Sequence, residues 1–202
     1  MAIFFTADLH LGHAAPIRLG GRPFESVEQE ADILIRNIND MCCQKDDLYI
    51  LGDFAYRIPI DRVNYHLSRI KPRIHWVNGN HDRGYQPEPG LVVEKTDYIR
   101  LKYDHMIFCL SHYPYEYWDR ERYGGYMLHG HIHSRGDSYN KKMHDIGWKR
   151  YDVGVDANDY YPVSLYQIVD FFKDLPPGGP NHHDSYGLWS TENITEDSDE
   201  KD

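Results

Sequence analysis

Short apolar runs alternate with amphipathic stretches through the first half of the chain. Three runs have the length and composition of buried strands: 3–7, 48–51 and 74–77. Residues 11–25, rich in Gly and Pro, read as a loop. Apolar side chains then recur at helical spacing over 26–41 and 60–70, and Ser26-Val27-Glu28-Gln29 has the form of a helix capping box. The resulting β-α-β-α-β order predicts a parallel sheet with helices packed on it.

The second half is richer in strand patterns. Strands are predicted at 91–94, 98–103, 105–110, 126–128 and 151–155, and the second and third of these form a hairpin that turns at Asp104. Ser164 is the predicted cap of a last helix, whose apolar face runs from Leu165 to Phe172. We expect residues 1–175 to form one domain, and residues 176–202, made of Pro, Gly, Asn and acids, to form a flexible acidic tail.

Charge and cysteine content narrow the classes of function. The net charge is −10, of which the last 22 residues contribute −6. An acidic protein is poorly suited to tight binding of long duplex DNA, so a small substrate is favoured. Three cysteines, Cys42, Cys43 and Cys109, form no disulfide framework and are expected to be small buried apolar residues of a cytoplasmic protein. No run is long enough for a membrane span, and no membrane partner is expected.

Polar groups follow five of the predicted strands. They are Asp8-Leu9-His10, Gly52-Asp53, Gly79-Asn80-His81-Asp82, His112, and Gly130-His131-Ile132-His133. Chemistry in α/β sheets gathers at the carboxyl ends of the strands, so these groups are expected to meet there. On extended chain, residues two apart share a face. The side chains of Asp8 and His10 would then point to the same side, and so would those of His131 and His133. Gly79 would give its turn backbone freedom. The mixture of Asp, Asn and His suits Mn, Fe, Co, Ni or Zn, and the lack of thiolates disfavours a structural zinc site.

These five blocks, in this order, closely resemble the calcineurin-like metallophosphoesterase superfamily over about residues 3–170. The stretches 8–13, 22–24 and 152–156 look like those of small stand-alone bacterial and phage members. The resemblance implies an α/β fold, a four-layer αββα sandwich of two mixed sheets flanked by helices, with the active site at the carboxyl ends of the strands.

The resemblance also implies a role for each residue. Asp8, His10 and His133 would hold one divalent metal ion; Asn80, His112 and His131 would hold a second; Asp53 would bridge them, with Mn the foremost candidate. His81 would not bind metal but would protonate the leaving oxygen, oriented by Asp82. A hydroxide shared by the two ions would attack the phosphorus in line.

Residues next to these blocks have two interpretations. His13, Arg22, Arg57 and Arg83 would contact the substrate phosphate, or the arginines would be ordinary solvated surface residues. The aromatic stretch 113–126 would stack on a base or aryl leaving group, or would pack on the body of the protein. Asp152 and Asp156 are expected to support local backbone and not to bind metal.

Three functions fit this pattern. The first is a metal-dependent phosphatase or phosphodiesterase acting on small or nucleotide-like phosphoesters. The second is a nuclease acting on short nucleic acid, although the chain lacks the large capping domain of the DNA-repair nucleases of this superfamily. The third is a non-catalytic interaction scaffold on the same fold; the complete set of ligand positions, with His81 and Asp82, favours an enzyme.

Overall fold

The computed structural model describes residues 1–176, and the predicted tail from 177 onward lies outside the described residues. The first half has the predicted β-α-β-α-β order: β1 (Ile3–Thr6), α2 (Val27–Met41), β2 (Asp47–Leu51), α3 (Ile60–Ser68) and β3 (Arg73–Val77). Ser26 caps α2 by accepting a hydrogen bond from the Gln29 N–H (3.1 Å). The strands β1, β2 and β3 pair in parallel, which confirms the predicted sheet.

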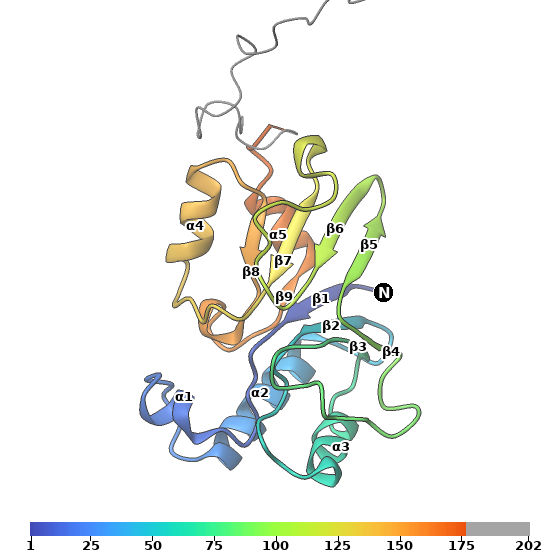
Figure 1. Cartoon of the computed structure of the whole chain (residues 1–202), viewed down its shortest axis with the longest axis vertical. Coiled ribbons are helices and arrows are strands. Elements are labelled where there is room, and N and C mark those ends of the chain that lie inside the picture. Colours follow the sequence, from blue (N-terminus) through green and yellow to red (C-terminus); the bar gives the residue numbers. More distant parts are fainter. Residues whose placement is uncertain (177–202) are drawn as a thin grey trace, which may run out of the picture.

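Two mixed sheets make up the molecule (Figure 1). The first has the order β4-β3-β2-β1-β9, with β4 (Glu94–Thr96) parallel and β9 (Val163–Ser164) antiparallel to its neighbour. The second has the order β5-β6-β7-β8, built from β5 (Ile99–Tyr103), β6 (Met106–Leu110), β7 (Tyr126–His129) and β8 (Arg150–Asp152). The predicted hairpin is the antiparallel pair β5–β6, and β6, β7 and β8 run parallel.

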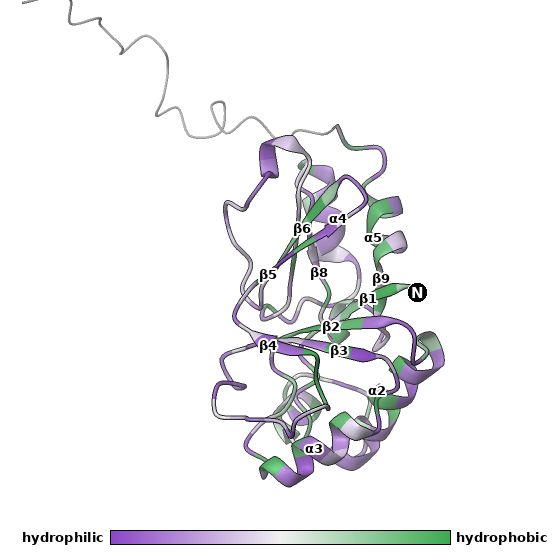
Figure 2. Cartoon of the chain, turned by 90° about the vertical axis from the view of Figure 1, so that its right-hand side faces the viewer, coloured by the Kyte–Doolittle hydropathy of each residue, from purple (hydrophilic) through white to green (hydrophobic). Residues whose placement is uncertain are grey.

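Alternating side chains of the first sheet divide the core into two layers. Phe4, Leu48 and Trp76 pack with α2 and α3 on one face. Phe5, Tyr49 and Val77 face the second sheet, and Ile168 and Phe172 join that layer from the region of α5 (Leu165–Phe171). Helices α2 and α3 therefore lie on one outer side and α4 (Ser138–Asp145) and α5 on the side of the second sheet (Figures 1 and 2). This is the expected four-layer αββα arrangement.

A few elements differ from the prediction. Strand β4 begins at Glu94, because Leu91 and Val92 pack as loop against the α2–α3 core layer. Helix α4 was not predicted, since only Asn140 and Met143 of its eight residues are buried and its sequence lacks an apolar stripe.

Three short helical segments were also not predicted: α1 (Ala14–Arg18), η1 (Glu121–Tyr123) and η2 (Val155–Ala157). Cys42 and Cys109 are buried as expected, but Cys43 is exposed. Among residues 1–176, no helix has both the length and the apolar character that crossing a bilayer requires.

Candidate metal centre

The polar groups predicted from the sequence gather where the two sheets meet, at the carboxyl ends of their parallel strands. Asp8 follows β1 and Asp53 follows β2, while His112 and His131 follow β6 and β7. Asp8, Asp53 and His112 offer ligand atoms within 4.8 Å of one another, and all three side chains are buried. Strands from both sheets therefore contribute to one site.

The backbone at this site differs from the extended chain expected for the two His-containing pairs. Asp8, His10, Asp53, His131 and His133 all have positive φ, between 47° and 72°. This left-handed region is costly for residues other than glycine and is found mainly at functional sites. The side chains thus converge because the strand ends turn sharply, and not because they alternate along a strand.

The loops after β2 and β3 approach each other closely, and this explains why residue 79 is a glycine. Its φ is not in the left-handed region, so the expectation of backbone freedom is wrong there. A Cβ at this position would overlap the Asp53 carboxylate, so glycine is required for space.

Asp8, His10 and His133 form the first group. The Nε2 atoms of His10 and His133 face each other at 3.1 Å. His133 Nδ1 lies 2.8 Å from Asp156 Oδ2, so this nitrogen carries the proton and Nε2 is left with a lone pair. Asp8 accepts hydrogen bonds from the His131 backbone N–H (2.9 and 3.1 Å), which ties this group to the next loop.

Asn80, His112 and His131 form the second group. His112 Nδ1 donates to the Leu51 carbonyl oxygen (2.9 Å), which leaves Nε2 as the free acceptor. That Nε2 atom faces Asn80 Oδ1 at 3.0 Å and His131 Nδ1 at 3.1 Å. Again, electron-pair donors converge on one point.

Asp53 lies between the two groups. Its Oδ2 atom is 3.5 Å from His10 Nε2 and 3.5 Å from His112 Nε2. Its Oδ1 atom accepts a hydrogen bond from the His81 backbone N–H (3.0 Å). One carboxylate oxygen is therefore oriented by the backbone while the other is shared, which is the arrangement that a bridging ligand needs.

The electrostatics of the site favour bound cations. Burial lowers the pKa of His10 to about 2 and also lowers that of His112, so both rings are neutral, as metal ligands must be. Burial lowers the pKa of His133, but its hydrogen bond with Asp156 and the charge of Asp8 outweigh burial and raise it. Burial raises the pKa of Asp8 well above its usual range. Facing lone pairs and buried carboxylates repel unless a positive charge lies between them, so the residues fit divalent metal ions.

The expectation that Asp82 orients the His81 ring is wrong, because its carboxylate bonds elsewhere. Its fully buried carboxylate accepts hydrogen bonds from the backbone N–H groups of Asp53 (2.6 Å), Phe54 (3.0 Å) and Gly79 (2.9 Å) and from Trp76 Nε1 (3.1 Å). The side chain joins the loops after β2 and β3 and so fixes the backbone that carries Asp53.

Arg22 is not free to contact substrate. Its guanidinium is buried, and its five N–H donors bond to Asp156, Glu30 and the carbonyl oxygens of Leu9 and Asp8. Arg22 therefore supports the loop after β1 and holds Asp156 against His133. The Asp156 carboxylate orients the His133 imidazole of the candidate centre, so the expectation that it supports local backbone is wrong. Asp152 does support local backbone, through Ser134 and Gly154.

A cavity of about 320 Å³ opens beside the first group. His10, His13, His81, His133 and Arg135 are among its lining residues. The His81 ring packs edge-on against Tyr56 (4.7 Å between centroids), and its Nε2 lies 3.8 Å from Asp53 Oδ2. The sequence pattern does not indicate Arg135, although it follows His133 by two positions.

The remaining substrate candidates lie around this cavity or beyond it. His13 stacks on Tyr56 (3.8 Å), and the Arg57 guanidinium lies over the same ring (5.1 Å). Arg83 is exposed, and within residues 1–176 no contact ties it to the metal-site side chains.

Two residues of the aromatic stretch 113–126 pack on the protein, as one of its two interpretations predicts. Tyr113 packs on the rings of His112 and His131 beside the metal site, whereas Trp118 packs on Trp148 in the body.

Two mixed sheets between helices, with clustered His and Asp side chains at the strand ends, define the αββα class of metal-site proteins. The model of the calcineurin-like phosphoesterase family matches residues 1–198, so the chain belongs to that family. The predicted family and fold are confirmed.

Several relatives are small proteins of similar length. The chain is 31% identical over 176 residues to "Uncharacterized protein MJ1445" of Methanocaldococcus jannaschii, covering 85% of this chain and 91% of that protein. It is 31% identical over 208 residues to "Gene 66 protein" of Mycobacterium phage D29, covering 87% and 98%. The crystal structure of AQ665 from Aquifex aeolicus, titled a protein of unknown function, superposes with a TM-score of 0.67 at 25% identity, covering 84% and 98%.

Proposed function

We propose that this protein hydrolyses phosphomonoesters or phosphodiesters of small or nucleotide-like molecules, with two divalent cations bound by its seven ligand side chains. One observation carries the proposal: two sets of electron-pair donors face inward on either side of a single shared oxygen, Asp53 Oδ2. Asp8, His10 and His133 would hold one ion, and Asn80, His112 and His131 the other. Mn²⁺ is the first candidate because the oxygens of Asp8, Asp53 and Asn80 suit it, and the four imidazoles make Ni²⁺ and Zn²⁺ the ions to compare with it.

When bound, the ions would supply Lewis-acid activation of water and of the phosphoryl oxygens. The chain's own residues would donate the proton and bind the substrate. His81 is partly exposed and lines the cavity, so its imidazole can donate a proton to the leaving oxygen. Tyr56 holds that ring edge-on, and the His81 backbone N–H is fixed on Asp53. Arg135 and His13, in the same cavity, would bind the phosphate or its substituent.

The size of the cavity and the acidic charge of the chain support a small substrate. Duplex DNA would need many phosphate contacts from lysine and arginine, which a chain with net charge −10 does not favour. A nuclease acting on short nucleic acid is the second candidate within the same chemistry.

The test is hydrolysis by metal-stripped protein reloaded with Mn, Co, Ni, Zn or Mg. The substrates are p-nitrophenyl phosphate, its bis ester, 2′,3′- and 3′,5′-cyclic nucleotides, and a short oligonucleotide. We expect turnover that depends on added metal and that Asp53→Asn abolishes. Faster cleavage of the oligonucleotide than of the small esters would favour the nuclease. Two bound ions without turnover of any substrate would favour a scaffold and overturn the proposal.

A further inference from the structure

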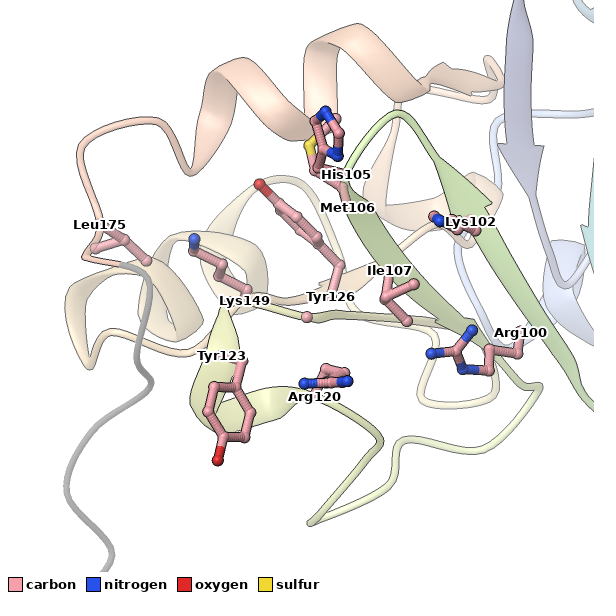
Figure 3. A pocket seen from close by; sticks show the side chains of 12 residues that line it. Arg100, Lys102, His105, Met106, Ile107, Arg120, Tyr123, Tyr126, Lys149 and Leu175 are labelled. Carbon is pink, nitrogen blue, oxygen red and sulfur yellow. The ribbon is translucent and has the colours of Figure 1, made fainter.

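A second hollow lies beside the second sheet, and Figure 3 shows the side chains that line it. Its volume is about 510 Å³, and Met106, Ile107 and Tyr126, at the beginnings of β6 and β7, are among its lining residues. His112 and His131 follow the other ends of these same strands. Strand β6 has five residues and β7 has four, so they span roughly 13–16 Å. No described residue that lines the hollow belongs to the metal centre, so the two sites are separate.

The hollow is strongly basic. Arg100 and Lys102 from β5, Arg120 before η1 and Lys149 before β8 all line it, together with His105. No acidic side chain of residues 1–176 is among those that line it. In a chain with 32 acidic and 22 basic residues, this concentration of one sign is unusual for a surface of mixed charge.

Most of these cations have no acidic partner. Arg100 pairs with Asp119 (2.6 Å). Among the residues that the structure describes, the side chains of Lys102, Arg120 and Lys149 make no hydrogen bond or ion pair with an acceptor. Arg120 packs over Tyr123 (5.3 Å) and Lys149 over Tyr126 (5.3 Å). Three unpaired cations around one hollow repel each other, and a bound anion would remove that cost.

The Lys149 side chain is only partly exposed, so an anion near its ammonium group would have a larger effect than at a fully exposed lysine. Burial lowers its pKa, which means that its surroundings disfavour the ammonium form. An anion held in the hollow would offset this penalty, and the three ammonium N–H donors would gain acceptors.

We propose that this basic hollow, defined by Arg100, Lys102, Arg120 and Lys149, binds an anion that carries two or more phosphate groups. The cations come from three separate segments around a hollow of about 510 Å³, which has room for a diphosphate or longer chain. The Tyr123 ring, 76% exposed at the rim, could stack on the base of a nucleoside polyphosphate. The site is independent of the proposed hydrolysis.

Calorimetry on the full-length, metal-stripped protein at low salt tests the proposal with pyrophosphate as the probe. We expect saturable binding that weakens as salt rises. Replacing Lys102 and Lys149 by Ala should weaken it about tenfold or more, as expected for loss of hydrogen bonds to charged groups. The matched control replaces two lysines of α4, Lys141 and Lys142, and should bind as the wild type does. Asp53→Asn should also bind normally, which separates this site from the metal centre.

A second set of titrations, with ADP, distinguishes a nucleotide from an inorganic polyphosphate as the natural ligand. If the natural ligand is a nucleotide, ADP binds more tightly than pyrophosphate, and Tyr123→Ala removes about tenfold of that advantage without changing pyrophosphate binding. If the ligand is an inorganic polyphosphate, Tyr123→Ala changes neither affinity. Absence of pyrophosphate binding, or binding that survives loss of both lysines, would overturn the proposal. So would binding seen only after the acids of residues 184–202 are replaced by their amides, because the chain's own acidic segment would then be the occupant.

Discussion

Replacing Asp82 by Asn is the most informative single change, because it separates a structural role from a catalytic one. The carboxylate is fully buried and accepts four hydrogen bonds that hold the loops after β2 and β3 together. Asn has the same shape, but one of its two acceptor atoms becomes an NH₂ donor.

The geometry sets the size of the effect. Asp82 Oδ2 accepts from Asp53, Gly79 and Trp76, whereas Oδ1 accepts from Phe54 alone. The Asn oxygen would therefore take the Oδ2 position, and its NH₂ would oppose the Phe54 N–H. One buried donor loses its partner, and three bonds lose an ionised acceptor, so we expect the free energy of unfolding to fall by about 2–4 kcal/mol. The shift of Asp53 should also weaken metal binding about 10- to 100-fold.

Urea unfolding of the metal-free protein and metal titration of the folded protein measure these two effects. Burial raises the pKa of Asp82, so the work is best done at about pH 8, well above the usual range of a carboxyl group. Asp97→Asn is the matched control. Within the described part of the chain its exposed carboxylate bonds only to the Asn78 side chain, and the change should cost less than about 0.5 kcal/mol. If Asp82→Asn kept normal stability and metal affinity but lost as much turnover as His81→Ala, Asp82 would act through the His81 ring and our reasoning would be refuted.

Four further changes test other parts of the site and fold. His81→Ala should lose most turnover but keep both metal ions by elemental analysis; metal loss would contradict a proton-donor role. Asp53→Asn should weaken both ions, so retention of two tight ions would exclude a bridge. Asp156→Asn should lower metal affinity about 10- to 100-fold by freeing His133, with a smaller change at the second ion, as resolved by titration. Burial lowers the pKa of His66 to about 4, so the unfolded chain takes up this proton first and stability falls as the pH drops from about 6.5 to 4; His66→Gln should flatten that part of a urea-midpoint profile, and an unchanged slope would exclude His66.

The elements that sequence alone predicted well are those with strong local patterns. The apolar runs that became β1, β2 and β3 and the helical spacing of α2 and α3 specify their structure through nearby residues. Helix α4 was not predicted and strand β4 was predicted too early in the chain, at 91–94, because the stability of both elements comes from neighbours in space. Asn140 of α4 bonds to the backbone of Asp152, and β4 pairs with β3 across a long loop.

The sequence by itself determined which atoms are available for chemistry: Asp, Asn and His placed after strands, in an order that resembles one family. The tertiary structure decided what each atom does. Arg22 and Asp156 lie 134 positions apart yet share two hydrogen bonds, and His10 and His133 meet across 123 positions. Such contacts depend on which strand ends lie side by side and on the left-handed turns that orient the side chains there. No local sequence pattern encodes these contacts. This is why the sequence could indicate which residues gather at the candidate site, whereas the supporting roles of Arg22, Asp82 and Asp156 became visible only in the folded chain.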